Sequence, residues 1–61
     1  MPVVKIDMWS GRTSEQKEQL IQEITEVFEN IGVPKEKTTV IINEVDKDNW
    51  GMEGKQASKL E

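Results

Sequence analysis

The sequence predicts an α/β (α+β) fold: a β-α-β subunit with two parallel strands, one crossover helix and a short C-terminal hairpin. Three observations support this prediction. Residues 2–9 place apolar side chains at every second position, residues 14–31 carry an apolar stripe with helical spacing, and residues 38–45 are rich in β-branched side chains. Strand, helix and strand in this order form a right-handed unit whose strands run parallel.

The first strand is expected over residues 2–9. Val4, Ile6 and Met8 recur with a period of two, so they should share one face of a half-buried sheet. Pro2 has no backbone N–H, but at the first position of a strand it removes no hydrogen bond from the ladder.

The helix is expected over residues 14–31, and both of its end signals are present. Thr13 and Gln16 fit a capping box, in which each side chain accepts a hydrogen bond from the backbone of the other residue. Gly32 stands where helices commonly end, and Pro34 prevents the helix from resuming. Between these ends, six apolar residues follow one stripe: Leu20, Ile21, Ile24, Val27, Phe28 and Ile31.

The second strand is expected over residues 38–45. Its centre, residues 40–42, is continuously apolar, which suggests that both faces of the strand are covered. Residues 46–54 contain two glycines and are interpreted as a loop or short hairpin. Residues 55–61 are interpreted as a polar tail.

The short length predicts self-association. The 61 residues are expected to form a single domain over residues 1–61, and a chain of this size hides only about 60% of its unfolded surface. Small domains compensate with disulfides, metals or oligomerisation. The chain has no Cys and no His, so disulfides are excluded and a zinc site would be unusual. We therefore expect a homo-oligomer.

Charge and hydropathy exclude two classes of partner. The net charge is −4, and no basic stripe offsets the repulsion from phosphates, so nucleic acid is not an expected partner. No apolar run approaches the ~18 residues that a membrane span needs, and no basic, apolar signal sequence stands at the N-terminus. The sequence therefore predicts a cytoplasmic protein without membrane contact.

Pro2 is the first candidate for catalysis. A small second residue usually permits removal of the initiator Met1, which would leave Pro2 with a free secondary amine. Such an amine is a base or nucleophile that needs no side chain. Because the chain lacks His and Cys, the competing bases are lysines and carboxylates such as Glu44 and Asp7. The plain alternative is that Pro2 only begins an edge strand.

Arg12, the only arginine of the chain, is the first candidate for binding an anion. A planar guanidinium can hold a carboxylate at two points. The substrate would then be a small-molecule carboxylate. The alternatives are that Arg12 satisfies backbone oxygens in a turn or pairs with an acidic side chain.

These residues, in this order, closely resemble the 4-oxalocrotonate tautomerase family of small tautomerases with a catalytic amino-terminal proline. The resemblance covers nearly the whole chain. Its strongest segments are residues 2–4 (PVV), 11–17 (GRTSEQK), 40–44 (VIINE) and 51–59 (GMEGKQASK). It implies a tautomerase-like β-α-β subunit that assembles into a homohexamer, a trimer of dimers. It also implies isomerisation of enols of unsaturated 2-oxo acids, typically 2-hydroxymuconate, without a metal or organic cofactor.

The resemblance also implies roles for individual residues. Pro2 matches the general base, and Arg12 matches an arginine that a neighbouring subunit contributes to hold the substrate carboxylate. Trp50 falls where the family places a large aromatic side chain that keeps the proline amine poorly hydrated. Thr39 replaces a second family arginine, which puts the specificity for dicarboxylates in doubt. Lys37, two positions earlier, would share a face with Thr39 on an ideal strand, and we hypothesise that it partly replaces the missing charge.

Several alternatives stay open from the sequence alone. Lys37 is equally well explained as a surface lysine, and Trp9 and Trp50 as aromatic residues of a subunit interface. We favour the interface role for Trp9 and the site for Trp50. The alternatives in function are a divergent member of the superfamily, acting on haloacrylates by hydration and dehalogenation or on phenylpyruvate, and a non-catalytic oligomeric module.

Overall fold

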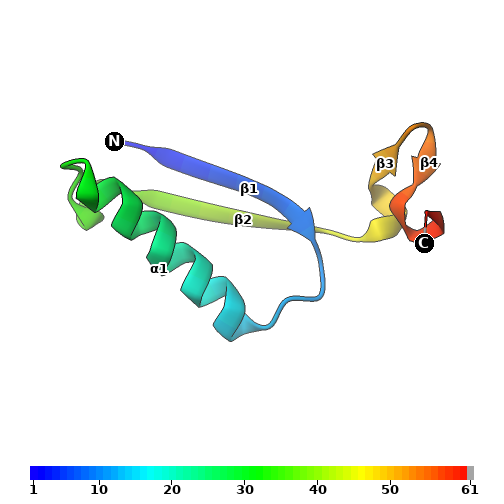
Figure 1. Ribbon diagram of the computed structural model, residues 1–61, viewed down its shortest axis with the longest axis horizontal. Helices are drawn as coiled ribbons and strands as arrows, with labels where there is room; N and C mark the ends of the chain where they lie inside the picture. Colours follow the sequence, from blue (N-terminus) through cyan, green and yellow to red (C-terminus); the bar gives the residue numbers. More distant parts are fainter. Residues whose placement is uncertain (61) are drawn as a thin grey trace.

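The computed structural model describes residues 1–60, which form two small sheets and one long helix (Figure 1). Three one-turn 3₁₀ helices, η1 (Lys35–Lys37), η2 (Lys47–Asn49) and η3 (Ala57–Lys59), connect or follow the main elements. The main elements, in chain order, are β1 (Val3–Trp9), α1 (Ser14–Asn30), β2 (Thr39–Val45), β3 (Gly51–Met52) and β4 (Lys55–Gln56). No helix within the described part of the chain is long and apolar enough to cross a membrane.

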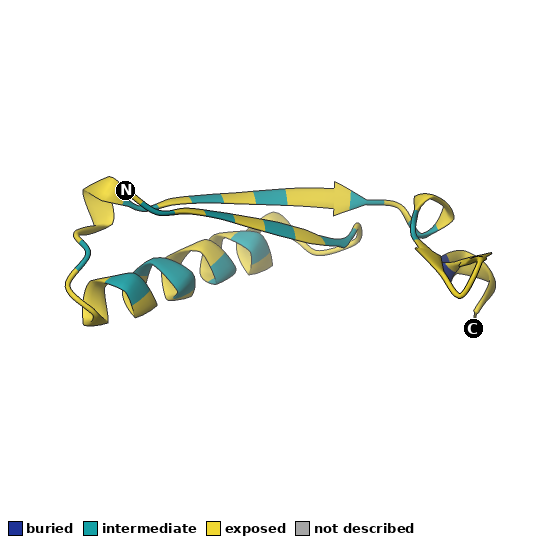
Figure 2. Ribbon diagram, turned by 90° about the horizontal axis from the view of Figure 1, so that it is seen from above, coloured by how far each residue is buried: buried dark blue, intermediate teal, exposed yellow. Residues whose placement is uncertain are grey.

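Strands β1 and β2 pair in parallel, as the sequence predicts, and α1 packs across one face of their sheet (Figure 2). The register places Val4 beside Val40 and Ile6 beside Ile42. All four of these side chains are half-buried on the face that α1 covers. The period-two pattern of residues 2–9 therefore sorts side chains between a covered and an open face.

The capping box that the sequence predicts is present at the start of α1. The Thr13 hydroxyl accepts from the Gln16 backbone at 3.1 Å, and the Gln16 side chain accepts from the Thr13 backbone at 3.0 Å. The helix ends at Asn30 with Ile31 as its C-cap, one residue short of the prediction. Gly32 then adopts a φ of 96°, which only glycine reaches without strain.

Much of the apolar surface of the chain is left open. The helical stripe divides into Leu20, Ile24 and Phe28, which are half-buried, and a second row at its margin, which stays exposed. On the open face of the sheet, Val3 and Ile41 are 53% and 44% exposed. The continuous apolar centre of β2 is therefore covered on one face only within a single chain. Such an open apolar face is typical of a surface that another chain covers.

The C-terminal segment corrects one expectation from the sequence. Residues 46–60 extend beyond the end of the β1–β2 sheet (Figure 1), and β3 and β4 form an antiparallel hairpin there. Glu53 and Gly54 connect these strands with φ values of 53° and 77°, as a two-residue type I′ turn requires. The prediction of a polar tail from residue 55 is wrong, because Ala57 is buried and its N–H donates to the Trp50 carbonyl at 2.7 Å. Residue 61 of that tail lies outside the described residues.

Candidate active site

Pro2 and Thr39 lie together at one end of the sheet. Pro2 is half-buried immediately before β1, and its carbonyl oxygen accepts a hydrogen bond from the Thr39 backbone at 3.1 Å. Thr39 begins β2 beside Val3, and both side chains are exposed on the open face. The structure therefore places the candidate base next to Thr39, the position that the sequence analysis matched to a second arginine.

Lys37 lies at this end too, but not on the strand. It is the last residue of η1, and its N–H donates to the Pro34 carbonyl at 3.0 Å. The prediction that Lys37 shares a strand face with Thr39 is therefore wrong, since strand alternation does not extend into a 3₁₀ turn. Its exposed side chain is still only two residues from Thr39.

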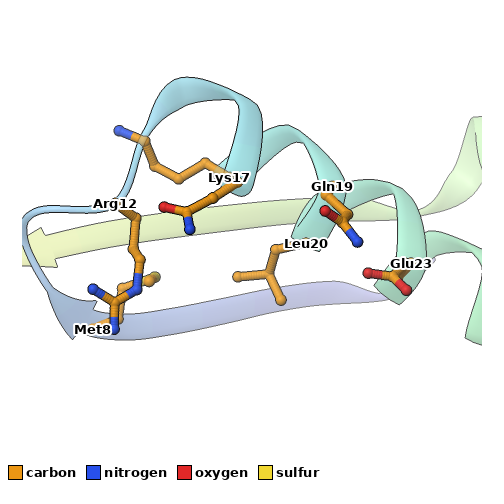
Figure 3. Close-up of a pocket in the computed structure, with 7 residues that line it drawn as sticks. Met8, Arg12, Lys17, Gln19, Leu20 and Glu23 are labelled. Carbon is orange, nitrogen blue, oxygen red and sulfur yellow. The ribbon is translucent and has the colours of Figure 1, made fainter.

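Arg12 is at the opposite end, in the connection between β1 and α1. It lines a groove of about 240 Å³ between the end of β1 and the first turns of α1 (Figure 3). Within residues 1–60 the guanidinium forms no hydrogen bond or ion pair, so neither plain alternative for Arg12 occurs in that part of the chain. The other lining residues are Met8, Gln16, Lys17, Gln19, Leu20 and Glu23.

Trp50 belongs to an aromatic cluster at the same end as Arg12. Its ring meets that of Trp9 edge to face, with centroids 5.9 Å apart and an interplanar angle of 77°. The Lys47 ammonium lies 4.6 Å from the centre of the Trp9 ring, a cation–π distance. The Trp9 indole nitrogen is buried without a hydrogen-bond partner among the described residues. The sequence analysis did not identify Lys47 as a candidate. The only sequence signal that could have done so is its position three residues before Trp50.

The two groups of candidate residues are separated by the length of the sheet. Pro2 and Thr39 precede or begin strands that run parallel, whereas Arg12 and Trp50 follow the ends of those strands. A seven-residue strand spans about 20 Å, at roughly 3.3 Å per residue. One chain therefore does not bring Pro2 and Arg12 to the same small substrate.

The two carboxylates considered as rival bases are both engaged within the chain. Glu44 accepts from the Lys17 ammonium at 2.7 Å, and Asp7 accepts from the Asn43 amide at 2.9 Å. The hydrogen bond from Lys17 is the main cause that lowers the pKa of Glu44, and the positive charge of Lys17 and the Gly11 backbone amide lower it further. A lowered pKa makes Glu44 a weaker base. Among residues 1–60, no three His, Cys, Asp or Glu side chains converge on a point that could hold a metal ion.

Comparison with known proteins identifies the family. The family model described as "Tautomerase enzyme" matches residues 2–59, and this chain belongs to that family. It is 44% identical to a 2-hydroxymuconate tautomerase of Bacillus subtilis, with 100% of both chains covered. The chain is thus an isomerase of the tautomerase type.

Solved structures agree with the fold. A 4-oxalocrotonate tautomerase isozyme of Methylibium petroleiphilum superposes with a TM-score of 0.88 at 42% identity, covering 97% of each chain. A heterohexamer 4-oxalocrotonate tautomerase of Chloroflexus aurantiacus gives a TM-score of 0.89 at 29% identity, with 100% of both chains covered. The small tautomerase-like fold that the sequence predicts is therefore confirmed.

Proposed function

We propose that this tautomerase interconverts the enol and keto forms of an unsaturated 2-oxo acid such as 2-hydroxymuconate. The full-length similarity to an enzyme named for that substrate carries the proposal. Pro2 supplies the general base, as a free secondary amine after removal of Met1. The position of Pro2, half-buried at the head of β1, supports this role.

In the proposed reaction one proton moves from oxygen to carbon. The Pro2 nitrogen takes the proton of the dienol hydroxyl, the C=O bond forms, and the conjugated double bonds shift toward the carbon that is protonated. The same nitrogen then returns the proton to that carbon, which leaves the amine neutral for the next cycle. No oxidant, reductant or cofactor is needed, because the substrate and product are isomers.

Arg12 and Trp50 have the supporting roles. The guanidinium of Arg12, which pairs with no group among residues 1–60, holds a substrate carboxylate in two places. Trp50 limits the hydration of the Pro2 amine. Desolvation and a nearby positive charge both disfavour the protonated amine, so both keep it in the form that accepts a proton.

Two chains, or more, build each proposed site. Pro2 and Arg12 lie at opposite ends of one sheet, and the exposed Val3 and Ile41 offer an apolar surface for another copy. We propose a homohexamer, arranged as a trimer of dimers, that works in the cytoplasm. The heterohexamer named for the Chloroflexus aurantiacus relative supports this assembly.

Thr39 favours a second candidate substrate. Its neutral hydroxyl stands where the family has a second arginine, so the site would hold one carboxylate firmly rather than two. A monocarboxylate such as phenylpyruvate, or a haloacrylate, fits such a site. Lys37 would act as a weaker point charge at the same end. An unchanged kcat/KM in Lys37→Ala with a dicarboxylate would remove Lys37 from the site.

The test of the proposed function follows the ketonisation of 2-hydroxymuconate by ultraviolet absorbance. Mass spectrometry first establishes that the purified chain begins with Pro2. We expect Pro2→Ala to lower kcat by up to about 10²–10⁴-fold, the full contribution of a general base, because the variant keeps only a primary amine in place of the secondary one. Arg12→Ala should lose mainly in KM. Equal rates for wild type and both variants would reject the catalytic assignment. Phenylpyruvate in the same assay distinguishes the second candidate.

A further inference from the structure

The loop that carries Arg12 is tied to the end of β2 at its first residue. The Ser10 hydroxyl donates to the Asp46 carboxylate at 2.7 Å, immediately after β2. The Ser10 backbone N–H also donates to the Val45 carbonyl, the last residue of β2, at 3.1 Å. The start of the loop is therefore fixed by a side chain and by the backbone.

The far side of the loop is tied to the same strand end. Lys17, in the first turns of α1, donates to Glu44 on β2 at 2.7 Å, and each side chain is 31% exposed. Thr13, the residue between Arg12 and α1, is fixed to the first turn of the helix by its capping box with Gln16. Glu44 and Asp46, two residues apart, thus hold the chain on both sides of Arg12.

The Arg12 side chain itself forms no hydrogen bond or ion pair with the described residues. Arg12 and Met8 both line the groove, and Figure 3 shows them at one end of it. The placement of this group therefore depends on the backbone of a four-residue loop. Fixing that backbone in advance removes an entropy cost that substrate binding would otherwise have to meet.

We propose that Glu44 and Asp46 are positioning residues, which orient Arg12 for the substrate carboxylate by clamping its loop at both ends. This proposal rests on the proposed function, in which Arg12 holds that carboxylate. Two acidic residues would thus support an anion-binding site without contacting the anion. An exposed ion pair stabilises a fold only slightly, so the principal effect of the Lys17–Glu44 pair should appear in substrate binding.

The test uses Glu44→Gln and Ser10→Ala in the full-length protein, with 2-hydroxymuconate as the substrate. Glu44→Gln removes the charge from the bond to Lys17, and Ser10→Ala removes the hydroxyl that donates to Asp46, so each change weakens one clamp and leaves Arg12 in place. We expect KM to rise about three- to tenfold with kcat within about twofold, because loosening a positioning group weakens binding before chemistry. Hydrogen exchange at the backbone amides of residues 11–13 should become faster in both variants. Glu18→Gln, on an exposed part of α1, is the matched control and should change neither quantity.

The same changes in an Arg12→Ala background decide whether the clamps act through Arg12. If they do, Glu44→Gln and Ser10→Ala raise KM no further once the guanidinium is gone. A full KM effect in that background, or an unchanged KM in the single variants, overturns the positioning role alone. If Arg12→Ala itself leaves KM unchanged, the proposed role of Arg12 is wrong and the positioning role falls with it.

Discussion

Mixing two impaired variants tests whether each active site draws on two chains. In Pro2→Ala every chain keeps Arg12, and in Arg12→Ala every chain keeps Pro2. The two positions flank a strand of seven residues, so they are about 20 Å apart along the sheet. Unfolding an equimolar mixture and refolding it distributes both kinds of chain at random over the assemblies.

The expected recovery follows from counting. A site that takes Pro2 from one chain and Arg12 from another has an even chance of receiving each wild-type residue. About a quarter of all sites should therefore be intact, and the mixture should reach about a quarter of the wild-type rate at substrate well below KM. A site built from one chain would recover nothing above the two variants refolded separately.

In a second mixture, sites within one chain would recover more activity than sites shared between chains. When wild type is refolded with the double variant Pro2→Ala, Arg12→Ala, sites shared between chains again recover about a quarter of the rate, whereas sites within one chain would recover about half. Wild type taken through the same refolding corrects for yield. Recovery of no activity in the first mixture together with half in the second would refute the shared site.

Three further predictions concern stability and are measured by thermal or denaturant unfolding. Gly32→Ala should destabilise the fold by about 1 kcal/mol through its φ of 96° alone, because an added Cβ would meet no atom of the described residues within 4 Å beyond its chain neighbours; an unaltered midpoint would contradict this. Thr13→Ala should cost about 1 kcal/mol through loss of the N-cap, and Thr13→Ser should restore most of it. The lowered pKa of Glu44 stabilises the fold above the unfolded-state value and ceases to do so as the pH falls through the folded-state value. Glu44→Gln should therefore lose less free energy of unfolding than wild type between neutral pH and pH ~3. Parallel plots of unfolding free energy against pH for the two proteins would show that Glu44 is not the cause.

The sequence was most informative where the signals were local. Thr13 and Gln16 cap α1 as predicted, and Gly32 ends it, because capping depends on residues three or four positions apart. The strands were placed to within one residue for a similar reason. Period two in β1 and a β-branched run in β2 are properties of neighbouring residues.

The wrong predictions concern elements that are too short to show a repeating pattern of apolar residues. Strands β3 and β4 have two residues each, so the second half of the hairpin was assigned to a polar tail. Lys37 was read as an extension of β2, although Pro34 begins a 3₁₀ turn that includes it. Burial of Ala57 depends on the hairpin folding back to the Trp50 carbonyl, a contact without a local signal.

The candidate residues could be chosen from the sequence by their type, whereas the contacts around them could not. Pro2 and Arg12 stand out by residue type, and their separation in one chain follows from the parallel strands. The ties from Glu44 to Lys17 and from Asp46 to Ser10 join positions 27 and 36 residues apart. Nothing in the local sequence pattern pairs such residues, since each is an ordinary polar side chain in its own segment.

Ala57 is the one side chain that is buried within residues 1–60, so a lone chain has almost no interior. In the homo-oligomer that we propose, folding and association become a single equilibrium, and the folded fraction depends on the total subunit concentration. Dilution into a kinetic assay would remove active sites without altering any of them. A substitution at Val3 or Ile41 would imitate a catalytic defect by the same route, so variants become comparable only at matched subunit concentration.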